Sequence, residues 1–325
     1  MKSEPLIIIN NVAARARQAW TVIRARLDQS GIGYKVSETE AAGDATILTR
    51  SALERGCEIV GVVGGDGTLS EAAAGYFTPP GCDGDEALPT PINSAAALAV
   101  LPAGTGDDFA RNLVGRRAPL EHWIDAFIAH CHDSREQTAR VVDVIRVRTD
   151  DYHRQVVCIN ASTLGLGGET AAGVAAQGES MRRFSGETRF VVAAMAALAA
   201  WRERPVKVQI DCEIVIEGPM NLVAVANARF AGGGMMLSPL AEINDGKLDV
   251  VTARGLTRAT ILRELIRIHK GGHVANPKVK IVQGRHASVQ TFAPDDALLI
   301  EVDGNVCGRT PADYVVMPNA LRIVA

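Results

Sequence analysis

The sequence predicts two domains of different construction: an α/β domain with a parallel sheet, followed by a mostly antiparallel, β-rich domain. Strand-like and helix-like segments alternate up to about Arg140, which is typical of parallel sheets with helical crossovers. Beyond that point strand-like runs follow one another closely, and two helical segments interrupt them. A chain of 325 residues is long enough for two cores. We assign residues 1–138 to the first domain and 139–311 to the second, and expect a tail from about 312 to 325 to return to the first.

The segments of the first domain follow in regular order. The strands are expected at Leu6–Ile9, Gly31–Val36, Ile59–Val63 and Leu98–Pro102, and the helices at about Ala13–Gln29, Asp44–Arg55 and Leu69–Gly75. The segment Tyr76–Ala95 is rich in proline and glycine and predicts an inserted surface loop. Ligands of parallel sheets bind at the carboxyl ends of the strands, so the loops that follow these strands are the expected place for a site.

The second domain is predicted from its β-type runs. These are Val141–Arg148, Arg154–Ile159, Val206–Ile210, Glu213–Ile216, Leu222–Asn227, Lys247–Thr252, Ala297–Ile300 and Tyr314–Ile323. Helical spacing of apolar residues predicts helices near Glu187–Trp201 and Arg258–Lys270.

Composition excludes several classes of protein. With 47% hydrophobic and 22% charged residues the chain is ordinary globular material, and its net charge of −3 gives no bulk attraction to nucleic acid. The six cysteines have no paired short spacing, which argues against a disulfide frame or a zinc site. The N-terminal residues lack a signal-peptide pattern, and the apolar segment Phe190–Trp201 is shorter than the roughly 20 residues of a membrane span. We expect a cytoplasmic protein with no nucleic-acid partner.

The loop after the third strand carries the clearest chemical signal. It reads Gly64-Gly65-Asp66-Gly67-Thr68, three glycines around one carboxylate. Glycines let backbone approach a ligand closely, and the N-terminus of the following helix favours phosphate. A carboxylate repels phosphate unless a divalent cation lies between them, so the loop predicts phosphate together with magnesium.

A second cluster follows the fourth strand. Gly104-Thr105-Gly106 leads into Asp107 and Asp108 at an expected helix start, before Phe109-Ala110-Arg111. One of the two aspartates can be explained as a helix N-cap. An N-cap does not account for both of them beside a glycine-rich loop at the same edge of the sheet, so we favour a role in ligand binding.

Two Asp-Gly pairs, Asp245-Gly246 and Asp303-Gly304, stand next to strands of the second domain. Tight turns explain each pair when it is considered alone, because Asp-Gly is a preferred turn sequence.

Taken together and in order, these four segments resemble the diacylglycerol kinase catalytic-domain family, which includes bacterial lipid kinases and sphingosine kinases. The resemblance covers nearly the whole chain, and the first two motifs are its most specific part. It implies an α/β N-terminal domain with a Rossmann-like parallel sheet, of the NAD kinase/diacylglycerol kinase type, and a mostly antiparallel β-rich C-terminal domain. It further implies ATP-dependent phosphorylation of a lipid alcohol, with diacylglycerol or a related lipid as the acceptor.

The resemblance also implies roles for individual residues. Phosphate-holding positions match Gly64, Gly65, Gly67 and Thr68, while Gly104, Thr105 and Asp107 match the second loop beside the nucleotide. Asn10 matches a position on the adenosine side of the nucleotide. Asp66 and Asp108 match catalytic carboxylates near the metal, Asp245 matches a magnesium ligand, and Asp303 matches the general base. The implied cofactors are ATP and Mg²⁺.

The chain departs from the family pattern at three places. Asp107 stands where the family usually has asparagine, and Asn305 stands where it often has glutamate. Asn11 stands where the family more often has proline. The first two changes alter charge close to the expected reaction, so a catalytically weak nucleotide- or lipid-binding protein is an alternative. An NAD kinase-like enzyme is another, because that family shares the Gly-Gly-Asp-Gly loop.

Contacts with lipid are open to two interpretations. The helix Phe190–Trp201 is either plain core or the lining of a lipid cleft. The basic face carrying Arg258, Arg263, Arg267 and Lys270 is either solvated or rests transiently on a membrane surface. Family resemblance also makes a homodimer an expected assembly.

Overall fold

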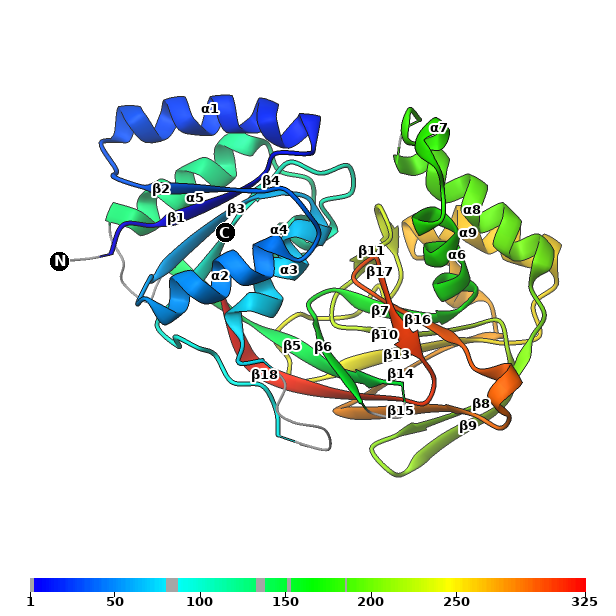
Figure 1. Cartoon of the computed structure of the whole chain (residues 1–325). Helices are drawn as coiled ribbons and strands as arrows, with labels where there is room; N and C mark the ends of the chain where they lie inside the picture. The colour runs from blue at the N-terminus through cyan, green and yellow to red at the C-terminus, as the bar shows by residue number, and fades with distance from the viewer. Residues whose placement is uncertain (1–2, 80–86, 133–137, 151–152, 185) are drawn as a thin grey trace. The chain divides into compact units, whose positions relative to one another are not determined.

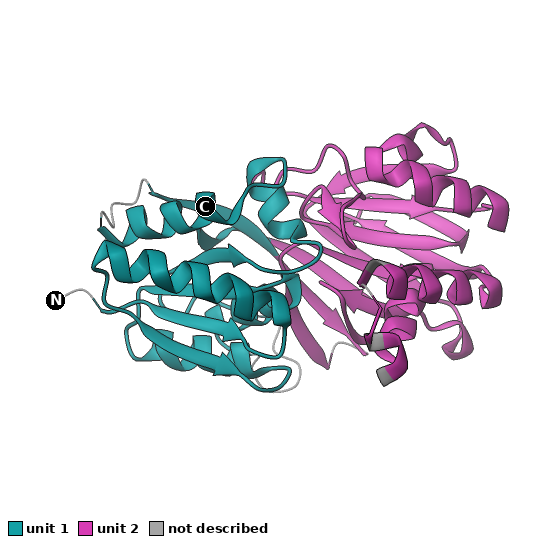
Figure 2. Ribbon diagram, turned by 90° about the horizontal axis from the view of Figure 1, so that it is seen from above, with its two compact units in different colours: residues 1–144, 317–325 teal, residues 145–316 magenta. Residues whose placement is uncertain are grey.

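The computed structural model describes residues 3–325 except 80–86, 133–137, 151–152 and 185. The chain divides into two compact units (Figures 1 and 2). Unit 1 consists of Met1–Val144 together with Met317–Ala325, and unit 2 consists of Ile145–Val316. From the sequence we expected the first domain to end at residue 138 and its C-terminal tail to begin at about residue 312.

Unit 1 contains a parallel sheet in the order β2-β1-β3-β4. Its strands are β1 (Leu6–Asn10), β2 (Lys35–Thr39), β3 (Ile59–Gly64) and β4 (Ala97–Pro102). All six residues of β3 are buried, as expected of a strand covered on both faces. The carboxyl ends of β3 and β4 are neighbours, since Gly64 pairs with Pro102.

Helices cover both faces of this sheet. They are α1 (Ala14–Ser30), α2 (Asp44–Glu54), α3 (Asp66–Tyr76), α4 (Asp108–Val114) and α5 (Leu120–His132). Figure 1 shows α1 and α5 on one face and α2 and α3 on the other. Trp123 and Phe127 of α5 are fully buried, and so are Ile7, Ile8 and Ile9 of β1.

Two segments of unit 1 differ from their predicted limits. The second strand begins at Lys35 rather than at Gly31, because Gly31 adopts a left-handed conformation (φ 71°) that ends α1, with its N–H donating to Asp28. Helix α3 begins at Asp66 rather than at Leu69. Gly65 is its N-cap residue, and Leu69 N–H donates to the Gly65 carbonyl at 3.1 Å. Asp66, Gly67 and Thr68 are therefore the first turn of a helix, not part of an open loop.

The expected inserted loop Tyr76–Ala95 is partly described. Phe77 forms an antiparallel bridge with Pro91, and the buried Tyr76 hydroxyl donates to the carbonyl of Ala96. The tip of this segment, residues 80–86, lies outside the described residues.

Unit 2 is built around two layers of antiparallel strands. One sheet has the order β14-β13-β10-β7-β16-β17. It comprises β7 (Ala161–Gly165), β10 (Leu222–Ala226), β13 (Leu248–Ala253), β14 (Val279–Gly284), β16 (Leu299–Val302) and β17 (Asn305–Arg309). The other layer comprises β6 (Arg154–Cys158), β8 (Arg204–Ile210), β9 (Ile214–Met220) and β15 (His286–Thr291), with parts of β5 (Ala139–Thr149) and β18 (Ala312–Val324). Inward side chains of both layers form one core, for example Val208 and Val289 against Val225 and Ile300.

The helices of unit 2 lie outside this core. They are α6 (Leu166–Ala175), α7 (Glu179–Arg182), α8 (Gly186–Ala200) and α9 (Arg258–Arg267), with short 3₁₀ turns at Ile268–Lys270, Gly272–Ala275 and Pro294–Asp296. The sheet containing β13 has a second apolar face, where Ile268 and Leu237 pack on Ala224 and Val251. A two-stranded hairpin, β11 (Phe230–Ala231) with β12 (Met235–Met236), completes the unit.

The chain passes between the units inside two strands. β5 begins in unit 1 and ends in unit 2, and β18 runs the other way. At its end, Ile323 and Val324 of β18 pair in parallel with Leu98 and Ala99 of β4. The predicted fold class is confirmed: a mostly parallel α/β unit is joined to an antiparallel, β-rich one. Among the described residues, no helix has the length and apolar character needed to cross a lipid bilayer.

Candidate functional site

The glycine-rich turn of unit 1 lies where β3 passes directly into α3. The helix starts one residue after Gly65, so its first N–H groups point out of the carboxyl end of the sheet, and such groups have no partner within a helix. At Gly64 a Cβ atom would lie 2.7 Å from the Thr68 side chain, so this glycine is required for the first turn to close. The arrangement offers backbone donors and the positive end of a helix dipole to an anion.

Asp66 joins this turn to the second loop. One oxygen of its carboxylate accepts the N–H of Asp108 and the other accepts the N–H of Phe109, both at 3.0 Å. These two N–H groups belong to the first turn of α4, which needs acceptors from outside the helix. Asp66 therefore fixes the start of α4 beside the start of α3.

The two loops touch through glycines. A Cβ atom on Gly104 would lie 2.6 Å from the Cα of Gly65, and one on Gly65 would lie 3.1 Å from the Cα of Gly104. Any side chain at either position would push the loops apart. Packing therefore accounts for Gly64, Gly65 and Gly104 without a ligand.

Gly67 is different from these three glycines. It is exposed, its φ is not positive, and a Cβ atom built on it would meet no atom within 4 Å. In a helix, glycine is less stable than alanine by roughly 0.5–1 kcal/mol. Neither packing nor backbone conformation explains a glycine here, whereas the close approach of a ligand to the helix N-terminus does.

Asn10 and Arg15 connect the beginning of the chain to both loops. The Asn10 side-chain amide donates to the Thr68 hydroxyl at 2.9 Å, and its oxygen accepts the N–H of Ala13 at 3.3 Å. Arg15 donates to the carbonyl of Gly104 at 3.1 Å. The sequence pattern identified Asn10 but not Arg15.

Asp107 has an unusual position. It is the N-cap residue of α4 and adopts a left-handed conformation (φ 48°), but its carboxylate accepts the N–H of Gly104 at 2.8 Å instead of capping the helix. Burial raises the pKa of Asp107, and the nearby carboxylate of Asp66 acts in the same direction. Arg117 donates to the Thr105 carbonyl at 2.6 Å and so adds positive charge to this loop.

Asp108 is buried, with 3% of its surface exposed. Its Oδ1 lies 4.0 Å from Nη1 of Arg111, one turn further along α4. The side chain thus lies inside unit 1 beneath the loop, while its backbone N–H is held by Asp66.

In unit 2, Asp303 and Gly304 form the two-residue turn between β16 and β17. Both have positive φ (47° and 90°), as a type I′ hairpin turn requires, and the flanking residues Val302 and Asn305 pair. The Asp303 carboxylate is buried and accepts three backbone N–H groups, from Ile159 at 2.8 Å, Asn160 at 2.9 Å and Ala161 at 3.2 Å. It therefore holds the corner between β6 and β7.

Glu301, two residues earlier, was not expected as a site residue. Its carboxylate accepts the hydroxyl of Thr163 at 2.6 Å and the N–H of Gly304. Burial raises the pKa of Glu301 to about 7, against these hydrogen bonds, and the charge of Asp303 raises it further. An acidic residue with a pKa near neutrality is thus attached to the same turn as Asp303. In the sequence, Glu301 is marked only by being an acidic residue within a strand that leads to an Asp-Gly turn.

Asp245 lies in a separate turn before β13. Its Oδ1 accepts the N–H of Lys247 at 2.9 Å. Asp249, at the start of β13, is buried, and desolvation raises its pKa while the charge of Asp245 raises it further. Asp249 occupies an ordinary strand position, so the sequence pattern does not mark it as a site residue.

The donor sets can be compared with the implied cofactors. The N-terminus of α3, the exposed Gly67 and the side chains of Arg15 and Arg117 at the neighbouring loop fit a polyphosphate. Within the described part of the chain, no group of three or more His, Cys, Asp or Glu side chains could hold a metal by itself. Mg²⁺ commonly uses one or two carboxylates together with water and substrate phosphates, so Asp245 suits it as a partial ligand.

The structure therefore brings one predicted set together within unit 1. Its members are Asn10, Gly64, Gly65, Asp66, Gly67, Thr68, Gly104, Thr105, Asp107 and Asp108. Asp245 and Asp303 belong to unit 2, on different turns. Their catalytic and metal-binding roles stay predictions.

Comparison with known proteins agrees with the pattern of motifs. Residues 4–147 match the diacylglycerol kinase catalytic domain, and residues 163–325 match the YegS C-terminal NAD kinase beta sandwich-like domain. The chain is 26% identical over 308 residues to a protein named diacylglycerol kinase from Mycobacterium tuberculosis (strain CDC 1551 / Oshkosh), covering 92% of this chain and 87% of that protein. It is 28% identical over 322 residues to a protein named Probable lipid kinase YegS-like from Chromohalobacter salexigens, covering 98% and 92%.

A solved structure confirms the fold. The crystal structure of a diacylglycerol kinase from Bacillus anthracis str. Sterne superposes with a TM-score of 0.67 at 19% identity, covering 99% of this chain and 96% of that one. The two family matches occupy the two halves in the order in which the motifs occur, and the second spans half of the chain. The chain belongs to the family of diacylglycerol kinases and bacterial lipid kinases.

Proposed function

We propose that this protein transfers the terminal phosphoryl group of ATP to the hydroxyl of a lipid alcohol, diacylglycerol or a related lipid. The observation that carries the proposal is the exposed Gly67 in the first turn of α3, beside a loop whose position is fixed by Asp66. Family membership supports phosphoryl transfer, and the relatives named for diacylglycerol and lipid substrates support the choice of acceptor.

In this proposal the residues of unit 1 bind and orient the nucleotide. The first N–H groups of α3 would donate to phosphate oxygens, and Thr68 is held for this purpose by Asn10. Arg15 and Arg117 place positive charge at the second loop. Such positioning and charge neutralisation are the main requirements of phosphoryl transfer. Mg²⁺, when bound, would neutralise charge on the phosphates, with Asp245 as its proposed protein ligand.

The proposed proton acceptor is Asp303. Its match to the general-base position of the family supports this role. The three backbone N–H groups that donate to its buried carboxylate fix its orientation, but they also stabilise its charged form. Glu301 is the competing candidate, because its pKa lies near neutrality and it is attached to the same turn.

The proposal is tested by incubating the protein with γ-labelled ATP, Mg²⁺ and a panel of acceptors. The panel contains diacylglycerol, sphingosine and NAD, the last because residues 163–325 match a domain named for NAD kinase. We expect label in a lipid and none in NADP. Label in NADP alone would replace the proposal with the NAD kinase alternative. Binding of ATP without any transfer would support the alternative of a catalytically weak binding protein. The acidic side chain of Asp107, beside the loop proposed to hold phosphate, is the feature that favours this alternative.

A further inference from the structure

Helix α9 presents an apolar stripe to solvent. Ile261 and Glu264 of this helix are buried, and so is Ile268 directly after it. Leu262 and Ile266, one turn apart on the opposite face, are 37% and 79% exposed. Two large apolar side chains at i and i+4 are therefore left without cover on a helix that is already anchored by its other face.

The segment that carries this stripe is rich in positive charge. Seven lysines and arginines lie between residues 254 and 280, with Glu264 as the one acidic residue in that segment, although the whole chain has a net charge of −3. Of these cations, Arg263 and Arg267 stand on α9, and Lys270 stands in the 3₁₀ turn that continues it. Positive charge is thus concentrated in this segment, although the net charge of the whole chain is negative.

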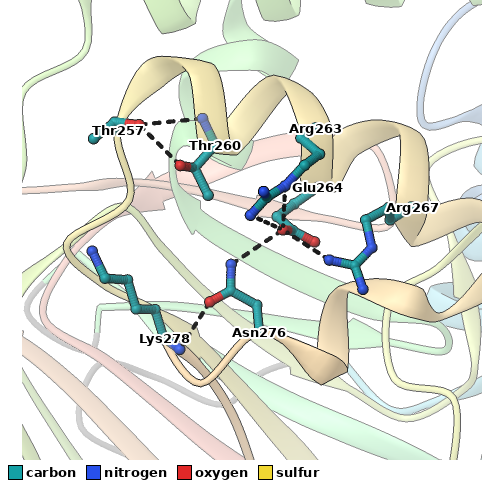
Figure 3. Close-up of polar contacts among 7 residues, drawn as sticks. All are labelled: Thr257, Thr260, Arg263, Glu264, Arg267, Asn276 and Lys278. Carbon is teal, nitrogen blue, oxygen red and sulfur yellow. Dashed lines mark hydrogen bonds and ion pairs between the residues drawn. The ribbon is translucent and has the colours of Figure 1, made fainter.

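Glu264 holds the two arginines of α9 in place (Figure 3). One oxygen of its buried carboxylate accepts hydrogen bonds from Arg263 at 3.3 Å, from Arg267 at 3.3 Å and from the Asn276 amide at 3.1 Å. Their side chains remain 64% and 39% exposed. The guanidinium groups are therefore ordered on one side of the apolar stripe before any partner arrives.

Arg258 does not belong to this surface. Its guanidinium donates to the carbonyls of Leu198 and Ala199 at the end of α8, at 3.0 and 2.8 Å. This residue fastens α9 to its neighbour, so the basic face expected from the sequence is reduced to three cations. We define the α9 face as Leu262, Arg263, Ile266, Arg267 and Lys270.

We propose that the α9 face docks onto the surface of an anionic lipid bilayer. The proposed docking rests on the lipid-kinase function proposed above, because it explains how a protein without a spanning helix among its described residues would reach an acceptor held in a membrane. Apolar side chains enter the boundary between headgroups and acyl chains while flanking cations meet lipid phosphates, which is how interfacial helices bind. The charge favours a membrane over a second copy of this face, whose cations would repel each other.

Cosedimentation with vesicles tests this docking. The unaltered protein is mixed with vesicles of phosphatidylcholine, or of phosphatidylcholine with an equal amount of phosphatidylglycerol, at low and at high salt. We expect binding to the anionic vesicles that weakens at high salt. Lys270→Gln should weaken binding about fivefold, and Ile266→Asp at least tenfold. Both positions are exposed, so neither change should alter the fold.

The matched controls come from unit 1. Ile47 of α2 is 64% exposed and Lys35 of β2 is exposed, so Ile47→Asp and Lys35→Gln make the same chemical changes elsewhere. They should leave vesicle binding unchanged. The docking is overturned if the unaltered protein ignores anionic vesicles, if Ile266→Asp binds as well as Ile47→Asp, or if Ile266→Asp abolishes self-association in sedimentation velocity without affecting vesicles.

Failure of the docking can be told apart from failure of the proposed function. Phosphorylation of a short-chain diacylglycerol dissolved as monomers needs no membrane surface. Transfer to that substrate without vesicle binding would remove only the docking. Vesicle binding that depends on Ile266 and Lys270, with no transfer to any lipid, would support the docking and remove only the kinase reaction.

Discussion

Asp66 in unit 1 and Asp303 in unit 2 are comparable residues in different surroundings. Each lies in a glycine-containing turn, and each directs its carboxylate to backbone N–H groups of another segment: Asp66 to the start of α4, and Asp303 to the corner between β6 and β7. What lies beside them differs. Next to Asp66 is an exposed glycine at a helix N-terminus, and next to Asp303 is a glutamate whose pKa is raised to about 7. The motif aspartates therefore act as anchors of backbone, and the neighbouring residues show which chemistry each turn can support.

The largest expected effect is that of Asp303→Asn. If this carboxylate is the general base, turnover should fall by about 10²–10⁴-fold, while ATP binding, which we propose for residues of unit 1, should persist. The amide would also place an N–H donor against the backbone donors of residues 159–161, which lowers stability. Turnover, ATP binding and thermal unfolding are measured on the same preparation. Near-normal turnover would leave Asp303 as an anchor alone and move the base assignment to Glu301.

Asp66→Asn tests the anchor in unit 1. The change removes the charge from two hydrogen bonds and sets an amide N–H against a backbone donor, so the free energy of unfolding should fall by about 1.5–3 kcal/mol. Urea denaturation measures it. Asp295→Asn, at an exposed position, is the control and should stay within about 0.5 kcal/mol. Equal stability of the two variants would contradict an anchoring role for Asp66.

Gly67→Ala separates the fold from the ligand site. The added Cβ atom meets open space and improves helix propensity, so stability should stay constant or rise by roughly 0.5–1 kcal/mol. ATP binding should weaken about tenfold, the equivalent of about 1.4 kcal/mol, because the methyl group would enter the space that we propose for phosphate. Calorimetric titration and thermal unfolding give both quantities. Gly64→Ala is the contrasting variant, since its Cβ atom would overlap Thr68 and should cost stability. Unchanged ATP affinity in Gly67→Ala would remove the phosphate assignment.

The last prediction concerns pH and is made for each step of one in pH. Glu301 has a folded-state pKa of about 7 against an ordinary value of 4.5, so between these values the folded protein binds more protons than the unfolded chain. Its contribution to stability is present in full below pH 4.5 and is lost as the pH rises through 7. Within that window the free energy of unfolding should fall by about 1.4 kcal/mol for each step of one in pH. Glu301→Gln should remove this slope. Urea unfolding across that range measures it, and parallel curves for the two proteins would refute the assignment.

The sequence predicted elements well where local pattern decides them. The buried run Ile59–Gly64 is apolar or glycine throughout, and such a run followed by glycines has few alternatives. β7 was missed although it lies between β10 and β16, because Ala161, Ser162 and Thr163 show no apolar alternation. Its strand character comes from pairing with neighbours on both sides, which the sequence does not display.

The same distinction applies to the candidate site. Glycines and aspartates of the two loops could be predicted because backbone demands restrict those positions to few residue types. Arg15 contacts Gly104, which lies 89 residues further along the chain. The sequence around an arginine on a surface helix does not indicate such a distant contact, so it could not be predicted. Glu301 would ordinarily be taken for a solvent-facing residue. Burial in the folded unit, with the charge of Asp303 as a further cause, raises its pKa to about 7.

The return of β18 to the first sheet has a consequence for synthesis. The residues of β18 that pair with β4 are Ile323 and Val324, more than 200 positions after the strand they complete. While a ribosome makes the chain, β4 would wait as an unpaired sheet edge until unit 2 had been translated, and such edges invite wrong pairing. Unit 1 therefore cannot complete its sheet first, although residues 1–144 of this unit are synthesised first. In this way the assembly of the earlier unit is coupled to the completion of the later one.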